Sequence, residues 1–226
     1  MQDKALIVTG ARGALGKVVA EIAQSRGARV ACIDHAPSQI RASAERIEIG
    51  GIDLSDAMQA KTAVDVAAKH FGRLDVLINI AGGFAFETVG DGDVKTWQRM
   101  YALNVLTALN TSRAALPYLA TSEAGRIVNI GAMGALQAGS GMGPYAASKA
   151  GVHRLTEALA SEWKGKVTVN AVLPSIIDTA ANRADMPKAD FSKWVTPQEL
   201  AEVILFLASD AASGVTGALI PVAGRV

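Results

Sequence analysis

The chain has a single cysteine among its 226 residues, so it can form no disulfide bond within itself. A metal cluster held by several thiolates is excluded for the same reason. Cys32 lies in an apolar run, which favours a buried structural thiol. The three histidines, His35, His70 and His153, have no spacing typical of a metal site, and we interpret them as surface or incidental residues. The sequence therefore predicts no metal centre.

The sequence also lacks an excess of charge of either sign and a long hydrophobic run. Lysine and arginine total 22 against 21 for aspartate and glutamate, which gives a formal net charge of +1. This balance provides no basic field for nucleic acid or for an anionic membrane. The apolar stretch within residues 1–8 is much too short for a signal peptide or a membrane anchor. We expect a cytoplasmic protein without nucleic-acid or membrane partners.

What the sequence does contain is a regular alternation of short apolar runs and longer stretches with helical periodicity. Hydrophobic residues make up 50% of the chain, enough for one sizeable core, and no repeat or linker interrupts it, so we expect one domain over residues 1–226. The apolar runs predict strands at residues 5–8, 29–33, 46–49, 75–80, 126–130, 167–172 and 218–222. Strands alternating with helices predict an α/β fold, a doubly wound parallel sheet that binds ligands beyond the carboxyl ends of its strands.

A glycine-rich turn follows the first predicted strand directly. Gly10, Gly13 and Gly16 allow the backbone to turn tightly and to approach a ligand closely. The helix predicted after them would offer free N–H groups and its positive dipole end to a pyrophosphate. The spacing is not the usual G-x-G-x-x-G, so a plain strand-to-helix connection stays open as an alternative.

An acidic residue and a basic residue near this turn point to different cofactors. Asp34 follows the second predicted strand, about twenty residues after the turn, where a carboxylate accepts hydrogen bonds from an adenosine ribose and repels a 2′-phosphate. Arg12 lies in the turn itself, where a guanidinium can hold that phosphate. The position of Asp34 is the more informative one, so we expect NAD(H) rather than NADP(H).

Tyr145 and Lys149 lie four residues apart at the start of a long helical pattern. This spacing places both side chains on one face of a helix. A cation held close to a phenol lowers its pKa from about 10 and prepares it for proton transfer with a substrate oxygen. Taken alone the spacing is weak evidence, because a solvated pair on a helix surface has the same pattern.

With the glycine turn, Asp34, Tyr145 and Lys149 in this order, the chain resembles the short-chain dehydrogenase/reductase family over nearly its whole length. Further segments match the family's motifs: Asp53-Leu54, the turn at 79–82, Asn104, and Pro174 to Thr179. The resemblance implies a seven-stranded parallel sheet of the Rossmann type. It also implies an NAD(P)-dependent oxidoreductase, commonly a homodimer or homotetramer.

The family's reaction is hydride transfer between a nicotinamide and a carbonyl or related carbon of a small-molecule substrate. The resemblance makes Tyr145 the general acid in reduction and the base in oxidation. It implies that Lys149 lowers the pKa of Tyr145 and holds the nicotinamide ribose, and that Asn104 holds a water in a proton relay. The expected cofactor contacts are Gly10, Arg12, Gly13, Ala14, Leu15, Gly16, Asp34, Asp53, Leu54, Asn79, Ala81, Gly82, Tyr145, Lys149, Pro174, Ile177 and Thr179.

Two departures from the family pattern bear on function. In the glycine turn, Ala14 replaces the family's middle glycine, and Gly13 stands one residue earlier. More consequential is Ala132, which stands where the family carries its catalytic serine, thirteen residues before the tyrosine. A missing oxyanion donor can cost roughly 10²- to 10³-fold in rate. Ser140, in the glycine-rich loop 138–143, is the nearest replacement, although the pattern favours an ordinary turn-forming serine.

A site without serine coincides with a closer resemblance to the dihydropteridine reductases within this family. The shared features are the turn at 11–16, the alanine at 132, the Ala-Gly-Gly segment 81–83, and parts of 173–194. In that subgroup NADH reduces a quinonoid pterin, an electron-poor ring that accepts hydride without a strongly polarised ketone. Asn104 and the strand that contains Asn129 follow the wider family instead, so the substrate does not transfer with the resemblance.

The segment from 176 to 196 occupies the place of a substrate lid. Met186, Phe191 and Trp194 lie in it among charged residues. Two interpretations stay open: an apolar wall for a flat or bulky substrate, and a packed surface loop. Ala132, Ser140, Met186 and Trp194 are the expected substrate contacts.

We expect Glu87, Asp91 and Asp93 to form a polar loop after the fourth predicted strand, and a border of the substrate site is the alternative interpretation of this loop.

These observations predict an NAD(H)-preferring oxidoreductase that passes hydride to a carbonyl or quinonoid acceptor. One alternative is a ketone reductase or alcohol dehydrogenase in which Ser140 or water replaces the serine. An alternative of another class is a regulatory protein that binds NAD(H) without turnover. The missing serine favours it, whereas Tyr145, Lys149 and Asn104 oppose it.

Overall fold

Seven parallel strands form the centre of the molecule in a computed structural model that describes residues 1–37 and 42–226. The strands are β1 (Ala5–Thr9), β2 (Arg29–Ile33), β3 (Arg46–Ile49), β4 (Val76–Asn79), β5 (Gly125–Ile130), β6 (Val167–Pro174) and β7 (Leu219–Val222). Their order across the sheet is β3-β2-β1-β4-β5-β6-β7, and each neighbouring pair is parallel. The doubly wound parallel sheet predicted from the sequence is confirmed.

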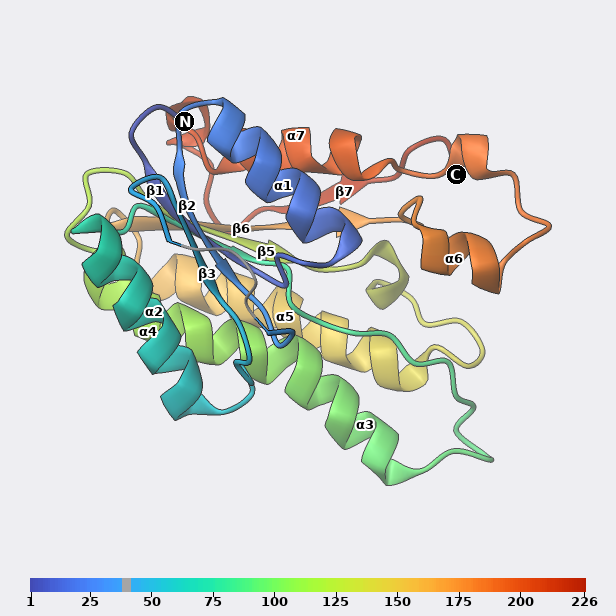
Figure 1. The fold of residues 1–226 in the computed structure, drawn as a ribbon. Coiled ribbons are helices and arrows are strands. Elements are labelled where there is room, and N and C mark those ends of the chain that lie inside the picture. Colours follow the sequence, from blue (N-terminus) through green and yellow to red (C-terminus); the bar gives the residue numbers. More distant parts are fainter. Residues whose placement is uncertain (38–41) are drawn as a thin grey trace.

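Helices cover both faces of this sheet (Figure 1). One face carries α1 (Ala14–Ser25) and α7 (Pro197–Leu207), and the other carries α2 (Ala57–Phe71), α4 (Thr107–Leu119) and α5 (Gly143–Glu162). Two shorter helices, α3 (Val94–Tyr101) and α6 (Ala180–Asp185), lie toward the carboxyl ends of the strands. Alternate strand residues serve the two faces, because Leu6 and Val8 pack beneath α1 and α7 whereas Ala5 and Ile7 face α2 and α4.

Cys32 belongs to the core beneath α1 and α7, where burial raises the pKa of its thiol to about 12. The predicted structural thiol is therefore confirmed. His70 is exposed, as predicted, whereas His153 is buried, so the surface interpretation was wrong for that residue. Its place is described below.

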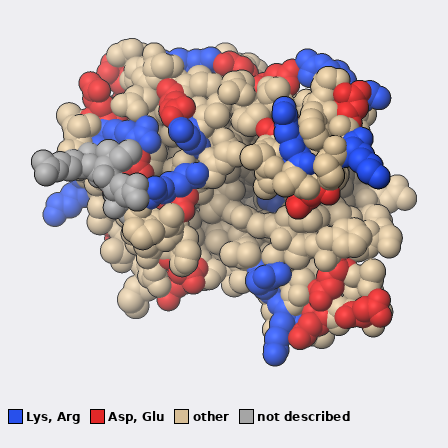
Figure 2. Space-filling view, turned by 45° about the vertical axis from the view of Figure 1, so that its right-hand side comes forward, with Lys and Arg blue, Asp and Glu red and all other residues tan. Residues whose placement is uncertain are grey.

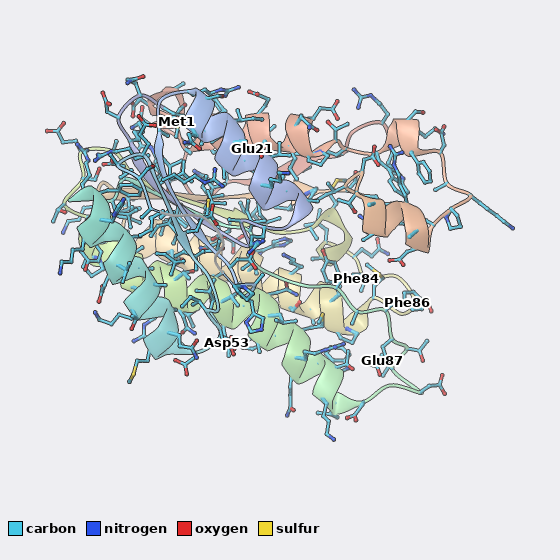
Figure 3. All side chains as sticks on the ribbon, viewed as in Figure 1. Met1, Glu21, Asp53, Phe84, Phe86 and Glu87 are labelled. Carbon is cyan, nitrogen blue, oxygen red and sulfur yellow. The ribbon has the colours of Figure 1, made fainter. Side chains whose placement is uncertain are left out.

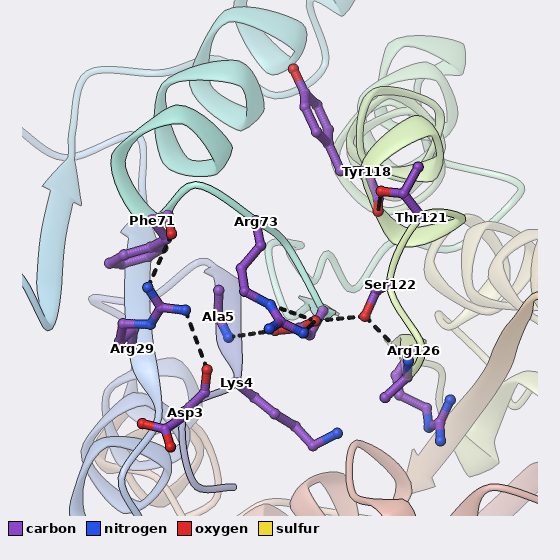
Figure 4. Close-up of polar contacts among 12 residues, drawn as sticks. Asp3, Lys4, Ala5, Arg29, Phe71, Arg73, Tyr118, Thr121, Ser122 and Arg126 are labelled. Atoms are coloured by element: carbon purple, nitrogen blue, oxygen red, sulfur yellow. Dashed lines mark hydrogen bonds and ion pairs between the residues drawn. The ribbon is translucent and has the colours of Figure 1, made fainter.

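At the amino ends of the strands, Asp75 joins three segments of the chain through Ala5, Arg73 and Ser122, which are labelled in Figure 4. Its Oδ2 accepts the Ala5 N–H of β1 at 2.9 Å, and its Oδ1 accepts the Ser122 hydroxyl at 2.5 Å and two N–H groups of Arg73. Burial alone would raise the pKa of Asp75, but the hydrogen bonds from Arg73, Ser122 and Ala5 outweigh it and hold the pKa below its ordinary value. The hydrogen bonds of the Asp75 carboxylate therefore hold together the chain segments at the amino ends of the strands.

Near the carboxyl ends, a buried polar network ties β4 and β5 to two helices. Asn79 and Asn129 are partners in the strand register, and the Asn79 amide donates to Asn129 Oδ1 at 2.9 Å and to Ser112 at 3.1 Å. Thr111 donates to Asn79 Oδ1 at 2.7 Å, and Asn129 donates to Thr156 at 2.9 Å. The side chain of Asn79 is therefore committed to this interior network, and its cofactor contact stays a prediction.

Candidate functional site

The glycine turn depends on its glycines for packing as well as for ligand access. Gly10 has φ of +63°, and a Cβ on it would lie 2.9 Å from the backbone of Ala81. A Cβ on Gly16 would lie 2.1 Å from the Gly10 carbonyl oxygen, which no backbone shift of a few tenths of an ångström relieves. The first turn of α1 therefore packs directly on the end of β1.

The start of α1 leaves backbone donors available. Gly13 precedes the helix without a side-chain cap. The N–H groups of Ala14, Leu15 and Gly16 find no acceptor within residues 1–37 and 42–226. Free N–H groups and a positive dipole end, with no Cβ over the turn, match the requirements of a pyrophosphate. The residues present fit a dinucleotide cofactor here.

Asp34 connects the end of β2 to this turn. Its Oδ2 accepts the backbone N–H of Arg12 at 2.9 Å, and its Oδ1 accepts that of Ala36 at 3.0 Å. Each carboxylate oxygen retains a second lone pair for a hydroxyl donor. The Arg12 guanidinium donates to the Pro37 carbonyl on the same side of the turn. The structure thus brings both expected cofactor-selecting residues together.

Asp53 and Leu54 lie beyond β3 on the adenine side of the expected cofactor position; Asp53 is labelled in Figure 3. Asp53 accepts both the N–H and the hydroxyl of Ser55, and these hydrogen bonds lower its pKa. Leu54 is buried, and Asn110 of α4 donates to its carbonyl at 3.1 Å. The segment is therefore held in place by α4.

Asn104 lies in a π-helical segment, Ala102–Leu106, between α3 and α4. Such a segment contains an additional residue in one turn and changes the direction of its side chains. The Asn104 amide donates to the Gly83 carbonyl at 3.0 Å and to the Ser148 hydroxyl at 2.9 Å, and its Oδ1 accepts the Gly83 N–H at 3.0 Å. A Cβ on Gly82 would lie 2.5 Å from that oxygen. The side chain thus clamps the turn after β4 to α5.

The water-holding role that the resemblance implies for Asn104 stays a prediction. Both hydrogens of the Asn104 amide are committed to Gly83 and Ser148, whereas Oδ1 accepts the Gly83 N–H and has a second lone pair that a water can use.

Tyr145 and Lys149 lie on the predicted face of α5, but their electrostatics differ from the expectation. The Lys149 ammonium donates to the Ile130 carbonyl at 2.8 Å, and burial lowers its pKa to about 8. Burial raises the pKa of Tyr145 to about 12. Desolvation therefore shifts the Tyr145 pKa in the direction opposite to the lowering expected from Lys149. Tyr145 is a neutral phenol at pH 7.

The position of the missing serine is buried and offers no donor of its own. Ala132 carries a methyl group, and its backbone N–H donates to His153 Nε2 at 3.3 Å. Ser140 is exposed in the turn before α5 and makes no hydrogen bond within the part of the chain that the structure describes. The structure therefore does not bring Ser140 to Tyr145 through any such bond.

Phe84 is a site residue that the sequence interpretation missed. Its ring packs edge-to-face on that of Tyr145, with centroids 5.0 Å apart, and 55% of the residue remains exposed. Phe86 lies over Gly141 in the loop that leads into α5, and Figure 3 shows both rings beside that loop. A detectable signal was the pair of aromatic residues directly after the Gly82-Gly83 turn, where a polar loop was expected.

The acidic residues of this loop serve local structure. Asp93 caps α3 by accepting the Lys95 N–H at 2.9 Å, Glu87 accepts the Asp93 N–H at 3.0 Å, and Asp91 accepts the Thr88 hydroxyl. These bonds fix the loop that carries Phe84.

The segment from 176 to 196 contains the short helix α6 and, after it, a stretch that runs back to pair with the start of the segment. Thr179 caps α6 by accepting the Asn182 N–H at 3.2 Å, and Ile177 pairs with Val195. Trp194 is only 3% exposed and packs against Phe191, which favours the packed-loop interpretation over a substrate contact for this residue. Met186 remains more than one-third exposed.

A hollow opens in the face that contains the carboxyl edge, with charged side chains of both signs around its rim (Figure 2). Across residues 1–37 and 42–226, no group of three or more His, Cys, Asp or Glu is arranged to hold a metal ion. In the same ranges, no helix has the length and apolar character needed to cross a membrane.

Comparison with known sequences identifies the family. The pattern of the short chain dehydrogenase family matches residues 4–190. The chain belongs to this family. A 2-(S)-hydroxypropyl-CoM dehydrogenase from Xanthobacter autotrophicus is 31% identical, over 99% of this chain and 96% of that protein. The 3-oxoacyl-[acyl-carrier-protein] reductase FabG of Thermotoga maritima is 30% identical, over 99% and 98%.

Solved structures of dehydrogenases share the fold of this chain. A ligand-free aldohexose dehydrogenase from Thermoplasma acidophilum superposes with a TM-score of 0.88 at 28% identity, covering 99% of this chain and 94% of that one. A carveol dehydrogenase from Mycobacterium avium, solved in complex with NAD, gives 0.87 at 26% identity, covering 99% and 97%. This short-chain dehydrogenase is thus an NAD(P)-dependent oxidoreductase with the family's Rossmann-like fold.

Proposed function

We propose that this enzyme uses NADH to reduce a planar, electron-poor acceptor of the quinonoid type, with Tyr145 as the proton donor. The observation that carries the proposal is the serine position. Ala132 has no hydroxyl, its N–H is engaged by His153, and Ser140 has no hydrogen bond to the site. A ketone needs such a donor to stabilise its developing oxyanion. A conjugated quinonoid ring spreads that charge itself.

The protonation states support reduction. When bound, NADH supplies the hydride and leaves as NAD⁺. Tyr145, neutral because burial raises its pKa to about 12, donates its proton to the heteroatom that becomes basic, and the resulting phenolate regains a proton from solvent. The ammonium of Lys149, held by the Ile130 carbonyl, provides the positive charge nearest to this exchange along α5.

The aromatic surface beside Tyr145 supports a flat acceptor. The Phe84 ring is fixed at 5.0 Å from the Tyr145 ring, and it follows the Gly83 backbone that Asn104 clamps. An exposed ring held in this way offers a stacking face for a planar molecule. The closer resemblance to dihydropteridine reductases points to the same substrate class and stays a prediction.

The cofactor preference rests on Asp34. Its carboxylate at the end of β2 has lone pairs for ribose hydroxyls and a charge that opposes a 2′-phosphate. We therefore propose NADH over NADPH.

We also propose a cytoplasmic homodimer or homotetramer, as the resemblance implies.

A ketone reductase is the second candidate, favoured by the names of the relatives, which include a ketoacyl reductase and a hydroxyalkyl dehydrogenase. Initial rates of NADH oxidation with a quinonoid dihydropterin, a benzoquinone and simple ketones separate the two. We expect quinonoid turnover and at least about 100-fold lower efficiency with ketones.

The Ala132→Ser variant sharpens this test, because it restores only the missing hydroxyl. We expect it to raise ketone reduction and leave quinonoid reduction unchanged, while the control Ser140→Ala changes neither. Efficient ketone reduction by the wild type would overturn the proposal. NADH binding, measured by tryptophan fluorescence, without turnover of any acceptor would also do so.

A further inference from the structure

His153 lies in the interior next to the serine position, although its sequence context indicated an incidental residue. It is 2% exposed and follows Tyr145 and Lys149 on α5 at intervals of four residues. The three side chains therefore lie on one face of the helix. That face packs against the end of β5, where the chemistry of the site is concentrated.

Lys149 and His153 hold neighbouring parts of the same strand end. The Lys149 ammonium donates to the Ile130 carbonyl at 2.8 Å, and His153 Nε2 accepts the Ala132 N–H at 3.3 Å. Gly131 lies between these two contacts, and a Cβ on it would lie 2.5 Å from His153 Nε2. Only glycine allows the imidazole to approach this closely.

The direction of the second bond defines the state of the ring. A backbone N–H is always a donor, so Nε2 must carry a lone pair and the imidazole must be neutral, with its proton on Nδ1. A charged imidazolium would present an N–H to the Ala132 N–H, and the contact would be lost.

We propose that neutral His153 is a positioning residue that fixes Ala132 and the end of β5 against α5. It thereby holds the serine position in place relative to Tyr145, the proton donor on the same helix. The proposal rests on the proposed function only in assigning proton donation to Tyr145. The proposal gives the serine position a second role. The Ala132 N–H donates to the His153 imidazole, which fixes the backbone there and leaves this N–H unable to donate to the substrate.

The surroundings of His153 favour the neutral state. Burial lowers its pKa, and the positive charges of Arg154 and Lys149 on the same helix lower it further. The residues around Gly131 from β5 and β6, Ala132 and Leu173, are not ionisable. Protonation therefore requires a pH below the ordinary histidine value of about 6.5. As the pH falls through the lowered pKa, the Ala132 contact breaks and turnover declines.

Two variants test this role. His153→Gln keeps a side-chain acceptor that does not titrate, and His153→Leu removes the acceptor at similar volume. We expect His153→Leu to lower kcat about tenfold at pH 7, with the NADH dissociation constant within twofold of wild type. We expect His153→Gln to retain kcat within about threefold and to lose the acid limb of the pH profile below 6.5. A retained acid limb in His153→Gln, or full kcat in His153→Leu, would overturn the proposal.

A readout without turnover keeps this test separate from the identity of the acceptor. In ¹⁵N NMR of the wild-type protein, His153 should show the Nδ1–H tautomer, and the Ala132 amide shift should change at the same pH as the ring. If His153 titrates near 6.5 while the Ala132 amide stays constant, the positioning role fails even where the enzyme is active. If both titrate together but no acceptor turns over, the role stands and the proposed function fails.

Discussion

Buried charges are stabilised differently at the two ends of the parallel strands, here called the amino edge and the carboxyl edge of the sheet. At the amino edge, the Asp75 carboxylate is surrounded by donors from Arg73, Ser122 and Ala5, and its pKa is held low. At the carboxyl edge, Lys149 is buried with one carbonyl partner and its pKa is lowered to about 8. The fold therefore favours the charged form of Asp75 and disfavours the charged form of Lys149.

The contrast extends to the neighbouring groups. A cavity of about 560 Å³ lies over Asp75, yet the carboxylate on its wall has its hydrogen bonds filled by the protein. At the carboxyl edge, the first N–H groups of α1 have no acceptor within the described residues, and Phe84 is exposed. An edge with its hydrogen bonds filled stabilises the fold, whereas an edge with groups left open can bind and react.

The largest effect is expected from Lys149→Met, which should lower kcat about 10³-fold, because the variant removes the positive charge on α5 that the proposed mechanism offers to the phenolate formed when Tyr145 donates its proton. The same variant should be more stable at pH 7, by on the order of 3 kcal/mol less the contribution of the lost hydrogen bond to Ile130. The reason is that a lysine whose pKa falls from 10.5 to about 8 destabilises the folded state below pH 8, and this cost is relieved only as the pH rises through 8 to 10.5. Thermal unfolding and initial rates measure both, with the exposed Lys164→Met as a control. A less stable, fully active variant would contradict the comparison.

Asp75→Ala should have the reverse effect, losing about 3 kcal/mol of stability with kcat unchanged. Since the pKa of Asp75 is lowered in the fold, its contribution is present above about pH 4 and is lost as the pH falls through the folded value. Urea unfolding at pH 7 and at pH 3 should therefore show that the difference in stability between Asp75→Ala and wild type is smaller in acid than at neutral pH. Arg73→Ala removes a half-exposed partner of Asp75 and should lower the stability much less than Asp75→Ala does. A loss of activity per folded molecule would show that the amino edge influences the chemistry.

Asp34→Asn tests the cofactor side of the carboxyl edge. The amide keeps the shape of the carboxylate but loses its charge and one acceptor, so kcat/KM with NADH should fall about tenfold. The efficiency with NADPH should rise relative to NADH, because repulsion of the 2′-phosphate is removed. Steady-state rates with both cofactors provide an internal control. An unchanged ratio would remove Asp34 from cofactor selection.

The smallest effect is expected at the rim. Phe84→Ala should raise KM for a planar acceptor about fivefold through loss of the stacking face, with NADH binding unchanged. Phe86→Ala, whose ring packs on Gly141, is the matched control and should change KM less. Equal effects in both variants would point to loop packing instead of substrate contact.

Local patterns in the sequence were sufficient for much of the fold and for part of the site. The strands, the glycine turn, Asp34 and the Tyr145/Lys149 face follow from periodicity and spacing, which act over a few residues. The predicted strand at 75–80 includes Asp75, which the structure places just before β4, where its side chain serves the amino edge.

The rest of the site depends on packing between distant segments. The π-helical segment at Asn104 gives no sequence periodicity of its own, and it acts through Gly83 and Ser148. His153 looks incidental until α5 is placed on β5, and Trp194 looks like a substrate wall until the return after α6 is packed. The pKa of Tyr145 likewise reflects burial, which spacing alone does not report.

The most direct test of the account is a single-turnover measurement on the enzyme–NADH complex mixed with a quinonoid dihydropterin, comparing wild type with Tyr145→Phe. The variant removes one hydroxyl and keeps the ring that packs against Phe84. We predict that NADH binds to both with affinities within twofold, and that the rate of NADH oxidation falls about 10³-fold in the variant. Equal rates in the two proteins would contradict the account, because hydride transfer would then proceed without the proton of Tyr145.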